Sequence, residues 1–170
     1  MIIGNNKNNI GAKNDYVNIP FVPNSETVLA YLQTGYYHVH GASFVFPDKA
    51  NPVQLTSAVA SWAETGNIIE VIPANAITKE FDLHWCKISA ISANLYGVID
   101  IFAGSIGNEV KIGAIPCSRT DNFSSETFAP VQVPQQLANT RISCRFTDST
   151  TSARTVNVKF CGHVYSTSLT

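Results

Sequence analysis

The stretch TVNVKFCGHVY (155–165) alternates apolar and polar side chains along most of its length. Successive side chains of a β-strand point to opposite faces, so the alternation predicts a strand with one buried and one solvated face. The predicted buried face holds Val156, Val158, Phe160 and Val164, and the other face holds Asn157, Lys159, His163 and Tyr165. Such a strand indicates an antiparallel sheet packed against a core.

The preceding stretch RISCRFT (141–147) alternates in the same way, with Ile142, Cys144 and Phe146 on one side. DSTTSA (148–153), which separates the two stretches, is rich in residues that favour turns. We therefore expect the two strands to pair as a hairpin with one wet face.

Similar runs separated by turn residues predict further strands. They are YYHVHGASFVF (36–46), IIEVI (68–72), EFDLHWCKIS (80–89), LYGVIDIFAG (95–104) and EVKIGAIPC (109–117). The last three are expected to follow one another as a meander. At least seven short strands predict an all-β fold, an antiparallel sandwich or barrel.

Two segments depart from this pattern. LTSAVASWAETG (55–66) places Leu55, Val59 and Trp62 at helical spacing, which predicts one short helix closing an end of the fold. Residues 118–140 contain few charges and many Ser, Thr, Asn and Pro residues, which predicts a long loop. Loops of that length in a compact domain are usually functional or interfacial.

The chain is expected to form an extended N-terminal arm, residues 1–33, followed by a β-sandwich domain, residues 34–170. Glycines and prolines interrupt the Asn-rich arm. The first residues lack the apolar region of a signal peptide, and no apolar run approaches the roughly 18 residues that span a bilayer. We therefore expect synthesis in the cytosol and no membrane partner.

The formal net charge of the 170 residues is −1, and only 14% of them are charged. Without a basic surplus the chain is a poor candidate for binding nucleic acid or anionic lipid. Its surface must be covered mostly by uncharged polar groups, which is typical of a β protein that contacts neighbours. The composition favours a subunit of an assembly.

The four cysteines, Cys86, Cys117, Cys144 and Cys161, are widely spaced and contain no C-x-x-C pair. This spacing does not predict a zinc or redox motif. In a chain made in the cytosol we expect them to be reduced and mostly buried.

The pair His38 and His40 in GYYHVHG (35–41) is a weak candidate for metal binding. Residues i and i+2 of a strand point the same way, about 6–7 Å apart, so the pair needs two further ligands. The motif resembles the first half of the cupin metal motif, but residues 41–46 lack the Glu that cupins place there. We therefore favour ordinary strand histidines and expect no bound metal or cofactor.

His84 and His163 would complete a cluster only if their strands lay beside residues 36–46. Strict alternation puts His84 on the same side as Asp82 and Cys86, and opposite Trp85, so it does not bring the histidines into one cavity. Asp82 and Glu80 are expected on a solvated face. The chain has no nucleophile elbow, phosphate loop or H-E-x-x-H helix, and we expect no enzyme activity.

A series of patterns runs along about residues 34–165: TGYYHVHG, FPDKA, GNIIEVIPAN, FDLHWCKIS, NLYGVIDIFAG, LANTRISCRF and GHVY. Together they resemble small virion structural proteins of tailed bacteriophages. The resemblance implies a jelly-roll-like β-sandwich that decorates or cements the phage head, or a head-fibre-type subunit, as a dimer or trimer. It implies location in the virion, assembly in the host cytoplasm, and the major capsid protein or other virion proteins as partners. It brings no active-site residues.

Two alternatives remain open. A receptor- or carbohydrate-binding fibre or tail module would use the aromatic residues Tyr36, Tyr37, Trp62, Trp85 and Tyr96, since aromatic rings stack on sugars. A cupin-like metal-dependent enzyme would use His38 and His40. On the decoration hypothesis, residues 1–33 and 118–140 are the expected contacts with capsid or sister subunits.

Overall fold

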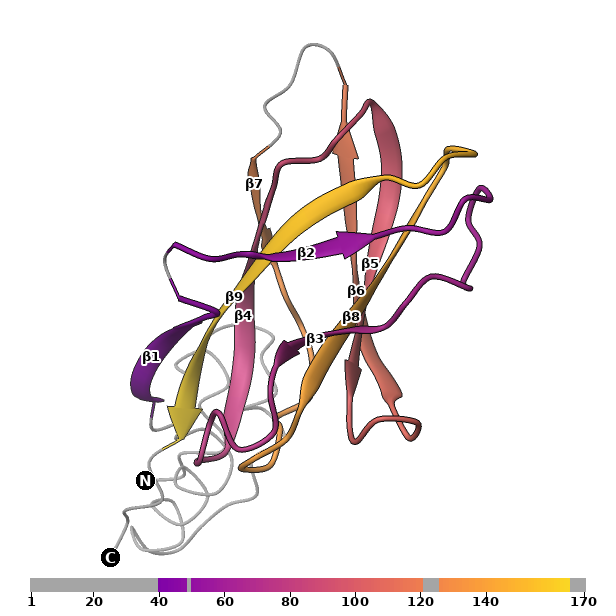
Figure 1. Ribbon diagram of the computed structural model, residues 1–170. Coiled ribbons are helices and arrows are strands. Elements are labelled where there is room, and N and C mark those ends of the chain that lie inside the picture. The colour runs from indigo at the N-terminus through magenta and orange to yellow at the C-terminus, as the bar shows by residue number, and fades with distance from the viewer. Residues whose placement is uncertain (1–39, 49, 121–125, 166–170) are drawn as a thin grey trace, which may run out of the picture. The chain divides into compact units, whose positions relative to one another are not determined.

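The computed structural model describes residues 40–48, 50–120 and 126–165, and at residues 40 and 41 it describes the backbone alone. This part of the chain forms nine strands and no helix (Figure 1). The strands are β1 (His40–Phe46), β2 (Val53–Thr56), β3 (Ile69–Ile72), β4 (Phe81–Ser89), β5 (Leu95–Ala103), β6 (Val110–Arg119), β7 (Thr127–Pro130), β8 (Ile142–Asp148) and β9 (Thr155–Tyr165). Among these residues no helix is available that could cross a membrane.

The strands form two antiparallel sheets. The first, which we call the β9 sheet, has the order β1-β9-β4-β7, and β2 also pairs with β9. The second, the β8 sheet, has the order β3-β8-β5-β6. In Figure 1 the long strand β9 runs beside β4, with β1 at one end of it and β2 at the other. The predicted all-β antiparallel sandwich is confirmed.

A single hydrophobic core joins the two sheets. Phe160 and Val158 of β9 and Phe146 and Ile142 of β8 are completely buried in it. The predicted apolar and polar faces of β9 are thus confirmed, and Val164 packs against the edge of the same core. Burial of each large apolar side chain stabilises the fold by about 1.5–3 kcal/mol.

The predicted hairpin of residues 141–165 is wrong, because β8 and β9 belong to opposite sheets. The turn between them is held at the buried Asp148, whose carboxylate accepts hydrogen bonds from the Ser57 hydroxyl and, at 2.6 Å, from the backbone N–H of Thr150. The alternation of apolar and polar residues shows which side of a strand is buried. Two strands that pair in one sheet and two strands that face each other across the core show the same alternation, so the pattern does not distinguish them. The meander is also split, since β5 and β6 pair while β4 lies in the other sheet.

The predicted helix over residues 55–66 is wrong as well. Leu55 lies in β2 opposite Val156 and is completely buried, whereas residues 57–66 form bends and turns. Trp62 has a φ of 57°, which a right-handed helix does not allow. Val59 and Trp62 are exposed, so their helical spacing with Leu55 does not correspond to one buried face.

The expected long loop over residues 118–140 contains the edge strand β7, which pairs with β4. Residues 121–125 of this segment lie outside the described residues, as does the expected arm 1–33. The strand expected over 36–46 is described from residue 40 onward, so the boundary between arm and sandwich is not placed.

Candidate functional site

The outer face of the β9 sheet contains a β-bulge in β4. Leu83 pairs with Gly162 and Trp85 pairs with Cys161, so His84 is an extra residue between them. Because of this insertion His84 and Trp85 both lie on the outer face, while Cys86 returns to the core and is completely buried. The expected sides of the strand are therefore wrong after the bulge: Trp85 lies on the outer face with His84, and Cys86 lies in the core.

Gly162 allows the strands to approach closely at the bulge. A Cβ atom at this position would lie 1.9 Å from the carbonyl oxygen of Asp82 and 2.7 Å from the ring of Phe44. Only glycine fits such a space, which is a common reason for glycine within a strand. Gly162 thus helps to hold β9 against β4 where the polar side chains gather.

Asp82, His84 and His163 meet beside the bulge and form what we call the histidine–aspartate cluster. The Nε2 atom of His84 lies 2.9 Å from Asp82 Oδ1 and 2.9 Å from His163 Nδ1, and the last two atoms are 3.7 Å apart. The imidazole rings are 4.2 Å apart between centroids and inclined by 72°. Three potential ligand atoms thus converge on one point.

Tyr165 holds the carboxylate of this cluster in place. Its hydroxyl donates a hydrogen bond of 2.5 Å to Asp82 Oδ2. Burial raises the pKa of the Asp82 carboxyl, but the hydrogen bonds from Tyr165 and His84 outweigh burial, so the pKa lies below its ordinary value. Burial and the neighbouring carboxylate raise the pKa of Tyr165 above its ordinary value, so the hydroxyl remains a donor.

The two sequence candidates for metal binding are not part of the described cluster. His38 lies outside the described residues, and of His40 only the backbone is described, paired with Tyr165. Asp82 lies on the outer face as expected, but its side chain is only 13% exposed. The cluster escaped sequence reasoning because the pairing of β4 with β9, which sets Asp82 opposite His163, leaves no clear signal in the sequence.

An apolar row crosses the same outer face next to the cluster. Cross-strand pairs align Val45 of β1, Cys161 of β9, Trp85 of β4 and Pro130 of β7. Trp85 is 48% exposed, and Phe128, which lies on β7 near the row, is 62% exposed. The row passes over every strand in the main path of the sheet, and we call Val45, Cys161, Trp85, Pro130 and Phe128 the apolar row.

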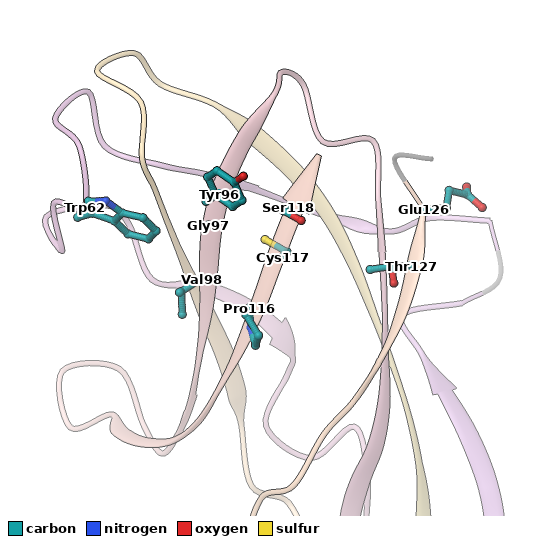
Figure 2. Close-up of a pocket in the computed structure, with 9 residues that line it drawn as sticks. All are labelled: Trp62, Tyr96, Gly97, Val98, Pro116, Cys117, Ser118, Glu126 and Thr127. Carbon is teal, nitrogen blue, oxygen red and sulfur yellow. The ribbon is translucent and has the colours of Figure 1, made fainter. Parts of the chain in front are cut away.

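A hollow with a volume of about 660 Å³ is lined mainly by β5 and β6 of the β8 sheet, and also by Thr127 of β7 in the β9 sheet. Figure 2 shows the ring of Trp62, on the turn that follows β2, directed toward the strand that carries Tyr96 and Val98. The rings of Trp62 and Tyr96 are about half and two-thirds exposed. Of the aromatic residues proposed for sugar binding, these two line one hollow, Trp85 lies on the other sheet, and Tyr36 and Tyr37 lie outside the described residues.

The outer face of the β8 sheet also carries an ion-pair network. The carboxylate of Asp100, a residue that is 3% exposed, forms ion pairs with Lys111 Nζ at 2.6 Å and with Arg145 Nη2 at 3.0 Å. Arg145 also pairs with Glu64, and Arg141, just before β8, forms a second group with Glu70 and Glu109; we call the two groups together the ion-pair network. The buried charges of this face are therefore paired within the chain.

The four cysteines are thiols, and Cys86, Cys117 and Cys144 are buried. Burial raises the pKa of Cys86 and of Cys117 to about 12, so neither is a thiolate near neutral pH. Cys161 is partly exposed in the apolar row. None of the described cysteines joins the histidine–aspartate cluster.

Comparison with known proteins assigns no family to the chain. No family model and no curated protein matches it. Among solved structures, one chain from the structure of infectious bursal disease virus Gt strain has a TM-score of 0.41 and 10% sequence identity, and the match covers 75% of this protein. The match spans 33% of that longer chain.

Proposed function

We propose that this protein is a non-enzymatic structural subunit of a tailed-bacteriophage virion, which decorates or cements the capsid through contacts between subunits. The observation that carries the proposal is the apolar row, which runs across the outer face of the β9 sheet with two large aromatic rings exposed. Large exposed apolar patches are uncommon on proteins that act alone, and they mark sites of interaction. The low charge of the chain and its resemblance to virion proteins support the same role.

The order of the strands supports a jelly roll as the form of this sandwich. Most successive strands cross from one sheet to the other, and only β1 with β2 and β5 with β6 stay in the same sheet. Such alternation between two sheets is expected for a jelly roll, which consists of two Greek keys. A jelly roll presents broad sheet faces, which suit lateral contact with a shell.

The apolar row is proposed as the contact with a neighbouring virion subunit. Trp85 and Phe128 provide large rings of the type that dominates interface energies, and Lys87 lies beside them with its ammonium 5.7 Å from the Phe128 ring centroid. Each contact can be modest, because many copies bound to one symmetric shell add avidity. Dimer or trimer formation, assembly in the host cytoplasm, and a contribution from residues 1–33 and 118–140 are parts of the same proposal.

Two measurements test the role. Quantitative mass spectrometry of virions of the phage that encodes the chain should find it in hundreds of copies if it decorates the head, and its absence from the particle would refute the proposal. In co-sedimentation with shells that lack it, the double variant Trp85→Lys, Phe128→Ser should fail to bind. The matched control Ile106→Ser, Val110→Ser removes two exposed apolar side chains outside the proposed contact and should bind normally.

A carbohydrate-binding fibre or tail module is the second candidate, and the hollow in Figure 2 favours it. Trp62 and Tyr96 flank a space large enough for a sugar ring, and Ser118 and Glu126 offer polar groups beside it. A glycan array should then show binding that Trp62→Ala and Tyr96→Ala each abolish, while Trp85→Ala retains it. An array without hits would remove this candidate.

A further inference from the structure

We infer that Asp82, His84 and His163 form a binding site for one divalent first-row transition metal ion, with Zn²⁺ as the reference ion. The site lies beside the apolar row but shares no residue with it, and it does not include the weak candidates His38 and His40. The inference stands on the position of the ligand atoms, on their chemistry, and on the groups that orient them.

The spacing of the atoms matches one small cation. A triangle with sides of 2.9, 2.9 and 3.7 Å has a circumradius of about 1.9 Å, slightly less than the about 2.0–2.2 Å of Zn–N and Zn–O bonds in proteins. An ion just out of the plane of Asp82 Oδ1, His84 Nε2 and His163 Nδ1 would therefore reach all three at normal bond lengths.

The donor set selects the class of metal. Two imidazole nitrogens and one carboxylate oxygen suit Zn²⁺, Co²⁺, Ni²⁺, Cu²⁺ and Fe²⁺, whereas Ca²⁺ and Mg²⁺ take six or more oxygen ligands, several of them often water. Without a metal ion, a proton on His84 Nε2 lies between Asp82 Oδ1 and His163 Nδ1. A bound metal ion would replace this proton. Zn²⁺ should therefore bind to the neutral form of both imidazoles.

The surrounding structure orients the ligands before any ion arrives. Asp82 and His163 are direct cross-strand partners, and His84, two residues after Asp82, lies on the same face of β4. The hydrogen bond from Tyr165 to Asp82 Oδ2 leaves Oδ1 directed at the imidazoles. Ligating carboxylates in proteins usually have such an outer partner, so Tyr165 is a positioning residue of the site.

The site is open on one side. The side chains of His84 and His163 are 36% and 25% exposed, while that of Asp82 is 13% exposed. Zn²⁺ sites with three protein ligands usually complete their coordination with water. The remaining position of this site would face solvent, so an added ion can enter without unfolding of the strands.

Isothermal titration of Zn²⁺ into metal-free full-length protein without a His tag tests the inference. We expect one ion per chain, and Co²⁺ should give the visible absorption of a low-coordinate nitrogen and oxygen site. His84→Ala and His163→Ala should each weaken binding by more than about 100-fold, beyond the about 10–100-fold typical of outer-shell changes. Tyr165→Phe should weaken it by about 10–100-fold and keep the Co²⁺ spectrum.

The double variant His38→Ala, His40→Ala is the matched control, since it also removes two histidines, and it should bind Zn²⁺ normally. Circular dichroism confirms that each variant is folded. The inference is overturned if folded wild-type protein binds no stoichiometric Zn²⁺, or if both cluster variants bind as well as wild type. Loss of binding in the double variant alone would transfer the site to His38 and His40.

Discussion

The outer faces of the two sheets carry their polar groups in opposite ways. On the β8 sheet, Asp100 and the two arginines of the ion-pair network find partners of opposite charge in the same chain, and the Arg145 guanidinium covers the Phe102 ring at 5.3 Å. On the β9 sheet, the histidine–aspartate cluster aims three ligand atoms at one point beside the apolar row. The charges of the first arrangement are paired within the chain, and we propose that the second arrangement contacts an ion and a partner.

This difference has a physical consequence for mutation. A buried charge that loses its partner remains desolvated and costs free energy, so changes in the ion-pair network should act on stability. Changes in the cluster or the apolar row should act mainly on binding, because these side chains are partly exposed. The predictions that follow test this separation, from the largest expected effect to the smallest.

Asp100→Ala should lower the free energy of unfolding by about 3 kcal/mol, because it leaves Arg145 with Glu64 as its carboxylate partner and removes the partner of Lys111. Urea denaturation followed by tryptophan fluorescence measures the change. The control Glu64→Gln, at a mostly exposed carboxylate, should change stability by less than about 1 kcal/mol. Equal effects of the two variants would contradict a network centred on Asp100.

Zn²⁺ at about 100 times its dissociation constant should raise the free energy of unfolding of the wild type by about 2.7 kcal/mol, since only the folded state brings the three ligands together. Thermal unfolding with and without Zn²⁺ shows the effect. His163→Ala should show no stabilisation by Zn²⁺ but nearly normal stability without it. If this variant were as unstable as Asp100→Ala, the cluster would be a structural network and the contrast between the faces would fail.

Tyr165→Phe should lower the free energy of unfolding by about 1 kcal/mol at pH 7, because Asp82 loses a hydrogen bond to its charged form. The pKa of Asp82 is lower in the folded protein, so this stabilisation is present above the ordinary carboxyl pKa of about 4 and is lost as pH falls through the folded value. Urea titrations at pH 7 and pH 2.5 should show the difference between wild type and variant shrinking. If the stability difference between wild type and variant persisted at pH 2.5, its cause would be packing of the Tyr165 side chain and not the hydrogen bond to the charged carboxylate.

Phe128→Ser should change the free energy of unfolding by about 0.5 kcal/mol or less, because the ring is mostly exposed on the edge strand β7. The same substitution should weaken co-sedimentation with capsid shells. Phe128→Ser should therefore lower binding and leave stability nearly unchanged, whereas Asp100→Ala should mainly lower stability. A large loss of stability would mean that the apolar row is part of the core.

Much of the fold is predictable because burial leaves a local signal. The alternation in residues 155–165 and 141–147 correctly marks which side chains are buried, since each strand has one face toward the core. The hairpin prediction failed because pairing partners are chosen by long-range contacts and alternation does not report them. The helix prediction failed because Leu55 is buried by its pairing with β9, independently of Trp62.

The candidate site was less predictable than the fold. The apolar row joins residues of four strands, so it exists only when those strands are aligned. The histidine–aspartate cluster needs the pairing of β4 with β9 that sets Asp82 opposite His163, whereas alternation alone puts His84 on the side of Asp82. Gly162 in GHVY is the one local sign, since a glycine inside a strand indicates a bulge or a close approach.

The sequence by itself determined that this protein is built from short antiparallel strands with a low surface charge, because burial and solvation act on each side chain locally. Only the tertiary structure decided that β8 and β9 face each other across the core and that His84 joins Asp82 and His163. The reason is that strand partners and bulges depend on contacts between residues far apart in the chain. Those contacts place the ion-pair network on one face and the ligand atoms on the other.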